Sequence, residues 1–105
     1  MKKIRILLLC LLFMSKSYAG TVVVTNNTSA LMGVILSALN FGFQDTIPAF
    51  SSKTETVPIS TGSIFYAGFL ASNNGISCQG TMMINQTLLI NSNTNPISSI
   101  ICQSV

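Results

Sequence analysis

Short apolar runs follow one another through residues 20–105, separated by turn-forming residues at intervals of about ten positions. β-Branched and aromatic side chains are common in these runs, and such side chains suit a pleated strand. Each run has the length of one strand and is shorter than most helices. We therefore expect an all-β fold: a small antiparallel β-sandwich of about six or seven strands, forming a single domain.

The strands are expected where the apolar runs lie, and one run is ambiguous. Residues 31–39 are continuously apolar, so a strand buried on both faces and a short helix capped by Ser29 would have the same hydrophobicity. Gly33 and the β-branched Val34 and Ile35 favour the strand. The expected strands are residues 21–25, 31–39, 53–59, 63–71, 76–84, 87–91 and 97–103.

One connection and one strand carry specific predictions. Residues 40–45 are expected to form a bend, which would place Phe41 and Phe43 in a loop. Pro58 has no backbone donor, and a proline of this kind is tolerated at the end of a strand or on an exposed edge. The run at 53–59 is therefore predicted to be an edge strand.

The pair Asn74-Gly75 is the strongest hairpin signal in the chain. It predicts that residues 63–71 and 76–84 pair as antiparallel strands. The alternation of apolar and polar residues in the second of these strands places Cys78 on the face that points into the core.

A basic start, an apolar stretch and a small-x-small site identify residues 1–19 as a cleavable signal peptide. The apolar stretch is about half of the ~20 residues that a membrane span needs, so cleavage fits better than an uncleaved anchor. Cys10 lies inside this stretch, after bulky leucines, which disfavours lipid attachment. We expect residues 20–105 to be exported by a bacterium and to be secreted or periplasmic.

Cys78 and Cys102 are the cysteines that remain after cleavage, and a pair in an oxidising compartment is normally bridged. We expect one disulfide between them, tying the last strand to a more central one. Closing a loop of this length stabilises the fold by about 3 kcal/mol in the chain-entropy model. A redox-active or metal-binding pair would need C-x-x-C spacing or histidines, and the chain has neither.

The net charge of +3 belongs largely to the leader. Residues 20–105 contain Lys53 against Asp45 and Glu55, a net charge of about −1. Binding to phosphates or to an anionic membrane surface needs several clustered Lys or Arg residues. Nucleic acid and membrane surfaces are therefore excluded as partners of the cleaved protein.

Residues 20–105 contain few side chains that could act as a general acid or base. The chain has no histidine, and these residues include one lysine and two carboxylates. Asp45 and Glu55 could be a glycosidase pair, but we expect Asp45 to close a turn and Glu55 to lie on a solvated edge beside an exposed Lys53. The serines have no base, the acidic residues are too few for calcium, and the glycines occur singly. We predict no catalytic, cofactor-binding or metal-binding residues, and therefore no enzyme.

Two further groups of residues could concern binding. Aromatic side chains could line a groove for a sugar or an apolar ligand, although we expect most of them in the core: Phe41, Phe43, Phe50, Phe65, Tyr66 and Phe69. Glycosylation-type N-x-[ST] patterns, which we interpret as chance matches, occur at Asn26, Asn27 and Asn85.

The functional expectation is a non-catalytic exported module that binds a partner at the bacterial envelope or outside the cell. Its contacts would be strand edges and the polar loops at 26–29, 40–45 and 91–96. The alternative is a self-assembling surface or matrix component that pairs through exposed strand edges, because the domain has little charge to prevent such pairing.

Overall fold

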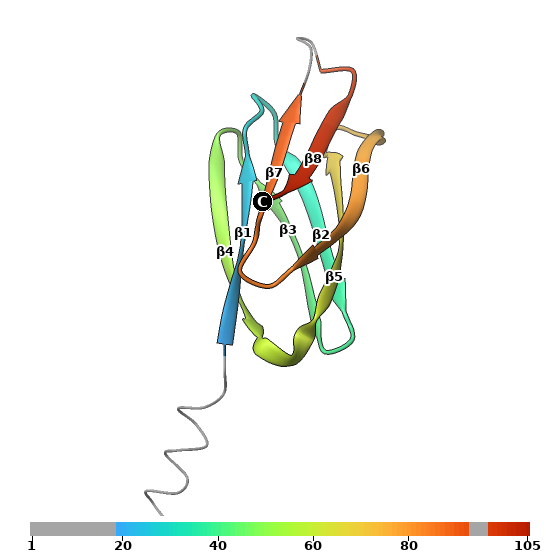
Figure 1. Cartoon of the computed structure of the whole chain (residues 1–105). Coiled ribbons are helices and arrows are strands. Elements are labelled where there is room, and N and C mark those ends of the chain that lie inside the picture. The colour runs from blue at the N-terminus through green and yellow to red at the C-terminus, as the bar shows by residue number, and fades with distance from the viewer. Residues whose placement is uncertain (1–18, 93–96) are drawn as a thin grey trace, which may run out of the picture.

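The computed structural model describes residues 19–92 and 97–105. In this part of the chain, eight strands and one short 3₁₀ helix form two four-stranded sheets that pack face to face (Figure 1). The elements are β1 (Ala19–Asn26), β2 (Met32–Ala38), β3 (Phe41–Ile47), β4 (Ser51–Pro58), η1 (Ile59–Thr61), β5 (Ser63–Leu70), β6 (Asn73–Met83), β7 (Thr87–Ser92) and β8 (Ile100–Ser104). The predicted all-β sandwich is confirmed.

The first sheet has the strand order β4-β1-β7-β8 and the second has the order β3-β2-β5-β6. Neighbouring strands are antiparallel except β1 and β7, which are parallel. Four strands therefore stand at sheet edges: β4 and β8 in the first sheet, and β3 and β6 in the second. The edge position predicted for the run at 53–59 is confirmed by β4.

The core lies between the sheets and is made by alternate residues of each strand. The first sheet contributes valines, leucine and isoleucine from β1 and β7, and the second contributes larger side chains from β2 and β5. The fully buried hydrophobic residues include Val22, Val24, Leu88 and Ile90 from the first sheet and Met32, Val34, Leu36 and Ile64 from the second. The run at 31–39 is thus a strand, as its β-branched residues predicted.

The prediction of a bend at 40–45 is wrong, because Phe41–Ile47 forms strand β3. The turn lies at residues 39–40, and β3 pairs with β2 along its whole length. Phe41 and Phe43 point inward and pack against the core. Their alternation with exposed Gly42 and Gln44 is the period-two pattern of a half-buried strand, and the turn propensities of asparagine and glycine obscured it.

The predicted hairpin between residues 63–71 and 76–84 is confirmed, but its turn is not at Asn74-Gly75. The chain turns at residues 71–72, and Leu70 pairs with Asn73. Because Phe69 pairs with Ser77, three residues of β6 lie opposite no residue of β5, and the Asn-Gly pair falls in this irregularity. The predicted alternation in β6 holds: Cys78 and Met82 point inward.

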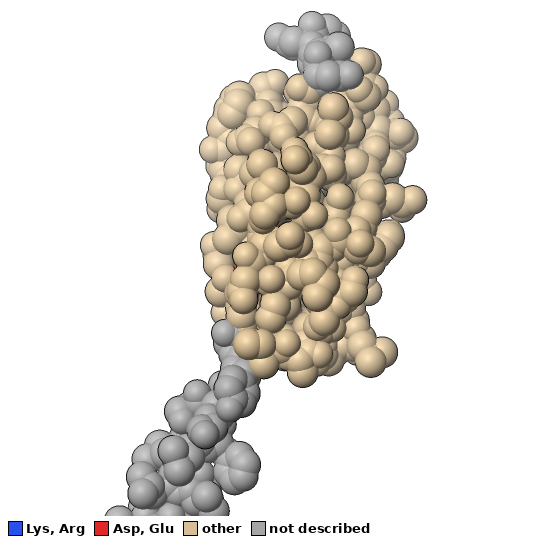
Figure 2. Space-filling view, in the orientation of Figure 1, with Lys and Arg blue, Asp and Glu red and all other residues tan. Residues whose placement is uncertain are grey.

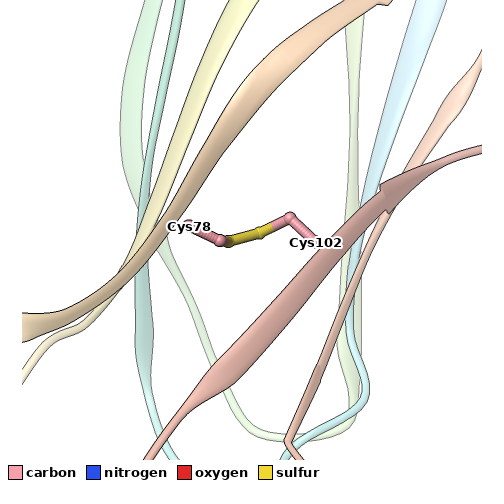
Figure 3. The surroundings of a disulfide bond; sticks show 2 residues. All are labelled: Cys78 and Cys102. Atoms are coloured by element: carbon pink, nitrogen blue, oxygen red, sulfur yellow. A yellow bond between two sulfur atoms is a disulfide. The ribbon is translucent and has the colours of Figure 1, made fainter.

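A disulfide between Cys78 of β6 and Cys102 of β8 closes one side of the sandwich (Figure 3). Their Cα atoms are 5.8 Å apart. We expected the disulfide to tie the last strand to a more central strand. This expectation is wrong, because β6 and β8 are both edge strands. The disulfide therefore links the edge of one sheet to the edge of the other. A Cβ added at Gly68 would lie 3.2 Å from the Cys102 sulfur, so a residue without a side chain makes room for the bridge.

The opposite side of the sandwich, between β3 and β4, is closed by an ion pair. Lys53 of β4 donates a hydrogen bond to a carboxylate oxygen of Asp45 of β3. In β3, Asp45 is on the same side of the strand as the buried Ile47. In β4, Lys53 and Glu55 are on the same side as the buried Val57. The two open sides of the sandwich, which we call its seams, are thus fastened by one covalent and one ionic link.

The side chain of Asn26 joins three segments at one end of the sandwich and is fully buried. Its Nδ2 atom donates to the carbonyl oxygens of Ala30 at 2.7 Å, Ile47 at 2.9 Å and Pro48 at 3.1 Å. Its Oδ1 atom accepts from the backbone nitrogen of Thr28 at 2.9 Å and from the Thr28 hydroxyl at 2.6 Å. The polar segment at 26–29 therefore has a structural role in fixing the β1–β2 connection against β3.

Candidate functional site

The charged residues considered as chemical candidates lie in the seam between β3 and β4. The hydrogen bond from Lys53 and a second one, from the backbone nitrogen of Thr46 at 2.7 Å, lower the pKa of Asp45 below its ordinary value. Asp45 is a strand residue, so the turn position expected for it is wrong. Lys53 is half-buried and paired with Asp45, where an exposed position was expected. Glu55 does lie on an edge strand, on the same side of β4 as Lys53.

Two kinds of feature are absent from residues 19–92 and 97–105. No group of three or more His, Cys, Asp or Glu residues is placed to hold a metal ion in this part of the chain. No helix among the same residues has the length and hydrophobicity to cross a membrane. The predicted signal peptide at 1–19 lies almost wholly outside the described residues.

The outer face of the second sheet carries two phenylalanines, Phe65 and Phe69. Cross-strand pairing arranges its residues in three rows, each running β3, β2, β5, β6. The rows are Gly42, Ser37, Phe65, Thr81, then Gln44, Ile35, Ala67, Gln79, then Thr46, Gly33, Phe69, Ser77. We call these twelve residues the aromatic face.

The centre of the aromatic face is apolar. Phe65 of β5 is 45% exposed, whereas Ile35, Ala67 and Phe69 are half-buried beside it. The ring of Phe69 lies on Gly33 of the neighbouring strand, so that a Cβ at position 33 would overlap the ring. Glycine thus provides a flat support that holds this phenylalanine against the sheet.

The borders of the aromatic face are polar and uncharged. Exposed amides and hydroxyls stand on both outer strands: Gln44 and Thr46 on β3, and Ser77, Gln79 and Thr81 on β6. The three charged residues of the described chain are not on this face. They occupy inward positions of β3 and β4, at the seam. Uncharged residues also cover almost all of the surface seen in Figure 2.

A shallow hollow of about 420 Å³ lies over β2 and β3 at one end of this face. Its lining includes Ile35, Ser37, Gly42 and Gln44. No heavy atom lies within 4 Å of the position that a Cβ of Gly42 would take, so the missing side chain leaves the space open. The aromatic face therefore combines two phenylalanines, one of them held against Gly33, with a hollow and polar borders.

The structure sorts the aromatic residues differently from the sequence prediction. Phe41, Phe43 and Tyr66 belong to the core or pack against it, while Phe65 and Phe69 lie outside it. The run at 63–71 is apolar on both faces, and this pattern gives no signal of which face meets solvent. A remaining phenylalanine is 71% exposed in the β3–β4 turn: Phe50, which has a positive φ of 54°.

The polar loops expected as contact surfaces are only partly available. Residue Asn26 is buried, which removes the first of the three N-x-[ST] patterns as an accessible acceptor. Segment 40–45 is mostly strand β3, and residues 93–96 lie outside the described chain. The outer face of the second sheet, rather than these loops, is the better candidate site.

Comparison of the sequence with protein-family models finds no matching family, and comparison with curated proteins finds no matching relative. The architecture and the aromatic face define a small disulfide-bonded β-sandwich with one aromatic, uncharged sheet surface. That surface is therefore the candidate functional site.

Proposed function

We propose that residues 20–105 act as a non-catalytic exported module that binds a partner at the bacterial envelope or outside the cell, and that the aromatic face is the binding surface. The observation that carries this proposal is the exposure of Phe65 and the support of Phe69 by Gly33 on an otherwise ordinary sheet face. Large apolar side chains grouped on a surface and rimmed by polar residues are typical of interaction sites.

The placement of the charged residues supports a non-catalytic role. Asp45 and Lys53 neutralise each other across the seam, and both are structural in that position. The contacts of Asp45 lower its pKa, so its carboxylate is charged at neutral pH and cannot serve there as a general acid. The disulfide uses both cysteines of the described chain.

Self-assembly through strand edges remains the alternative function. Inward-pointing charged residues on an edge strand oppose pairing with a second sheet, and β3 and β4 carry such residues in Asp45, Lys53 and Glu55. The edges of β6 and β8 carry no such charge, but β6 has a register irregularity and β8 has only 5 residues, and both features weaken an edge for pairing. We therefore favour binding through a sheet face. Sedimentation velocity over a wide concentration range separates the two: a monomer throughout excludes assembly, and concentration-dependent growth supports it.

The binding proposal is tested with purified residues 20–105 and a washed bacterial envelope fraction in a co-sedimentation assay. We expect the wild type to sediment with the envelope, and Phe65→Ala to reduce the bound fraction several-fold. Phe50→Ala is the matched control, because it removes an exposed phenylalanine outside the aromatic face. Equal binding by wild type and Phe65→Ala, or no binding by either, would contradict the proposal.

A second variant tests whether the seam takes part in binding. Asp45→Asn combined with Glu55→Gln removes both carboxylates of the domain and should leave envelope binding unchanged. Loss of binding in a folded double variant would show that the seam, and not the aromatic face, carries the function.

A further inference from the structure

The charge of the aromatic face limits what it can bind. All twelve of its residues are uncharged, and the charged side chains of the described chain lie at the β3–β4 seam on the inward side of the sheets. A phosphate, a sulfated or acidic polysaccharide, or a charged peptide would lose hydration on this face without gaining an opposite charge. The surface is therefore suited to a neutral ligand.

The polarity pattern limits the ligand further. The apolar side chains of the face, Ile35, Phe65, Ala67 and Phe69, stand on the two central strands, beside Gly33 and the polar Ser37. Except for Gly42, the residues of the two outer strands carry amides or hydroxyls, with Gln44 and Gln79 at the two ends of the middle row. Amide and hydroxyl groups both donate and accept hydrogen bonds. A ligand that matches this pattern has an apolar surface bordered by hydroxyl groups, which is the chemistry of a sugar ring.

We infer that the aromatic face binds a neutral oligosaccharide, with sugar rings stacked on Phe65 and Phe69 and their hydroxyl groups bonded to the flanking Gln, Ser and Thr side chains. This inference rests on the proposed function and names the ligand class of the same surface. An aromatic ring presents a negative face to which the weakly positive C–H groups of a sugar are attracted.

The dimensions of the face favour a chain of several sugars. Phe65 and Phe69 are four residues apart on one strand, a separation of about 13 Å along β5. The shallow hollow beside Ser37 and Gly42 continues this surface over β2 and β3. Together they form a continuous surface that is longer than a single hexose.

A protein partner fits the same surface less well. Binding hot spots between proteins are enriched in Trp, Tyr and Arg, and the aromatic face has none of them. Its two phenylalanines stand on a central strand of the sheet, and one is held by Gly33, so little side-chain freedom is lost on binding. A rigid surface of this kind loses little entropy on binding, so it can hold a ligand that makes few contacts.

The test is affinity gel electrophoresis of residues 20–105 in native gels that contain a soluble neutral polysaccharide: laminarin, galactomannan or dextran. Alginate serves as the anionic comparison. We expect at least one neutral polysaccharide to retard the wild type and alginate to leave its mobility unchanged. Phe65→Ala should weaken the retardation about tenfold in apparent affinity.

A second variant blocks the face without removing an aromatic ring. Gly42→Glu places a charged side chain at the open hollow, where no atom beyond the chain neighbours lies within 4 Å of the added Cβ, and should abolish the retardation. Phe50→Ala should behave as wild type. Circular dichroism and the thermal unfolding midpoint of each variant show that the fold is retained.

The outcomes separate this inference from the proposed function. Retardation by a neutral polysaccharide that depends on Phe65 and Gly42 supports both. Envelope binding that depends on Phe65, without retardation by any of the neutral polysaccharides, overturns the carbohydrate inference and leaves the binding module in place. Retardation that is unchanged in Phe65→Ala and Gly42→Glu overturns the assignment to this face.

Discussion

The ring of Phe69 on β5 lies against the backbone of Gly33 on β2, at a point where the two residues are cross-strand partners. Gly33→Ala would place a methyl group in the volume of the ring, and the ring would have to move. The overlapping atoms belong to a half-buried ring that can turn towards solvent, so we expect a loss of about 1 kcal/mol or less in the free energy of unfolding, measured by urea denaturation, together with weaker binding at the aromatic face.

The control for this substitution is Gly42→Ala on the same face. No heavy atom lies within 4 Å of the added methyl group, and the backbone is not in a conformation that requires glycine. We expect a change of zero to about 1 kcal/mol in the stabilising direction, because alanine restricts the unfolded chain. Equal destabilisation by the two substitutions would show that Phe69 does not depend on Gly33.

Removal of the disulfide should loosen one seam of the sandwich. Cys78 and Cys102 are separated by 24 positions in the sequence, and Cys78→Ala with Cys102→Ala should lower the free energy of unfolding by about 3 kcal/mol. The measurement is urea denaturation of the double variant beside the wild type with and without a reductant. A reductant that destabilises the double variant as much as the wild type would contradict this interpretation.

Asn26 should tolerate almost no substitution, because its amide nitrogen donates to three main-chain carbonyls in the interior. Asn26→Asp keeps the shape and the acceptor oxygen but replaces the donor with a charged acceptor. We expect a loss of about 3 kcal/mol or more at neutral pH. Asn27→Asp, at the exposed neighbouring position, should change stability by about 0.5 kcal/mol or less, and similar losses in both variants would contradict a special role for Asn26.

Local patterns in the sequence predicted most of the strands and the inward direction of Cys78. Alternation is a property of a few consecutive residues, so it can be read from a single strand. The same alternation exists at 41–47, but the asparagine and glycine at its start have turn propensities that compete with it. That strand was therefore missed, and with it the inward positions of Phe41 and Phe43.

The seams and the aromatic face depend on which strands become neighbours, and a sequence pattern does not contain that information. Asp45 and Lys53 are on different sheets, so their ion pair follows from the placement of β3 and β4 at facing edges. Phe65 and Phe69 lie in a run that is apolar on both faces. Only the sheet order shows which of these side chains meets solvent.

The ion pair at the β3–β4 seam should make stability depend on pH in the acidic range. The hydrogen bonds from Lys53 and Thr46 lower the pKa of Asp45 in the folded state below its ordinary value of 3.8. A carboxyl group of this kind stabilises the fold above its unfolded-state pKa, and the contribution is lost as the pH falls through its folded-state pKa. The stability advantage of wild type over Asp45→Asn should therefore be constant above about pH 5 and should fall as the pH drops below the ordinary value of 3.8.

The measurement is the urea midpoint of both proteins across this pH range at low ionic strength. Because both side chains are about 40% exposed, the advantage should be small and should shrink when salt is added. An advantage that increases as the pH falls would contradict the direction assigned to the pKa of Asp45.

Thr61 in η1 offers a substitution that should stabilise the domain. Its hydroxyl oxygen is buried and has no hydrogen-bond partner, alone among the buried side-chain nitrogen and oxygen atoms of residues 19–92 and 97–105. Thr61→Val keeps the shape and removes the unpaired group, so we expect the free energy of unfolding to rise by about 1 kcal/mol. Thr28→Val is the matched control: the Thr28 hydroxyl bonds to Asn26 and Ala30, and its loss should lower stability by about 1–3 kcal/mol. If Thr61→Val destabilised the domain to the same extent as Thr28→Val, the hydroxyl of Thr61 would have to be hydrogen-bonded in solution, for example to a buried water.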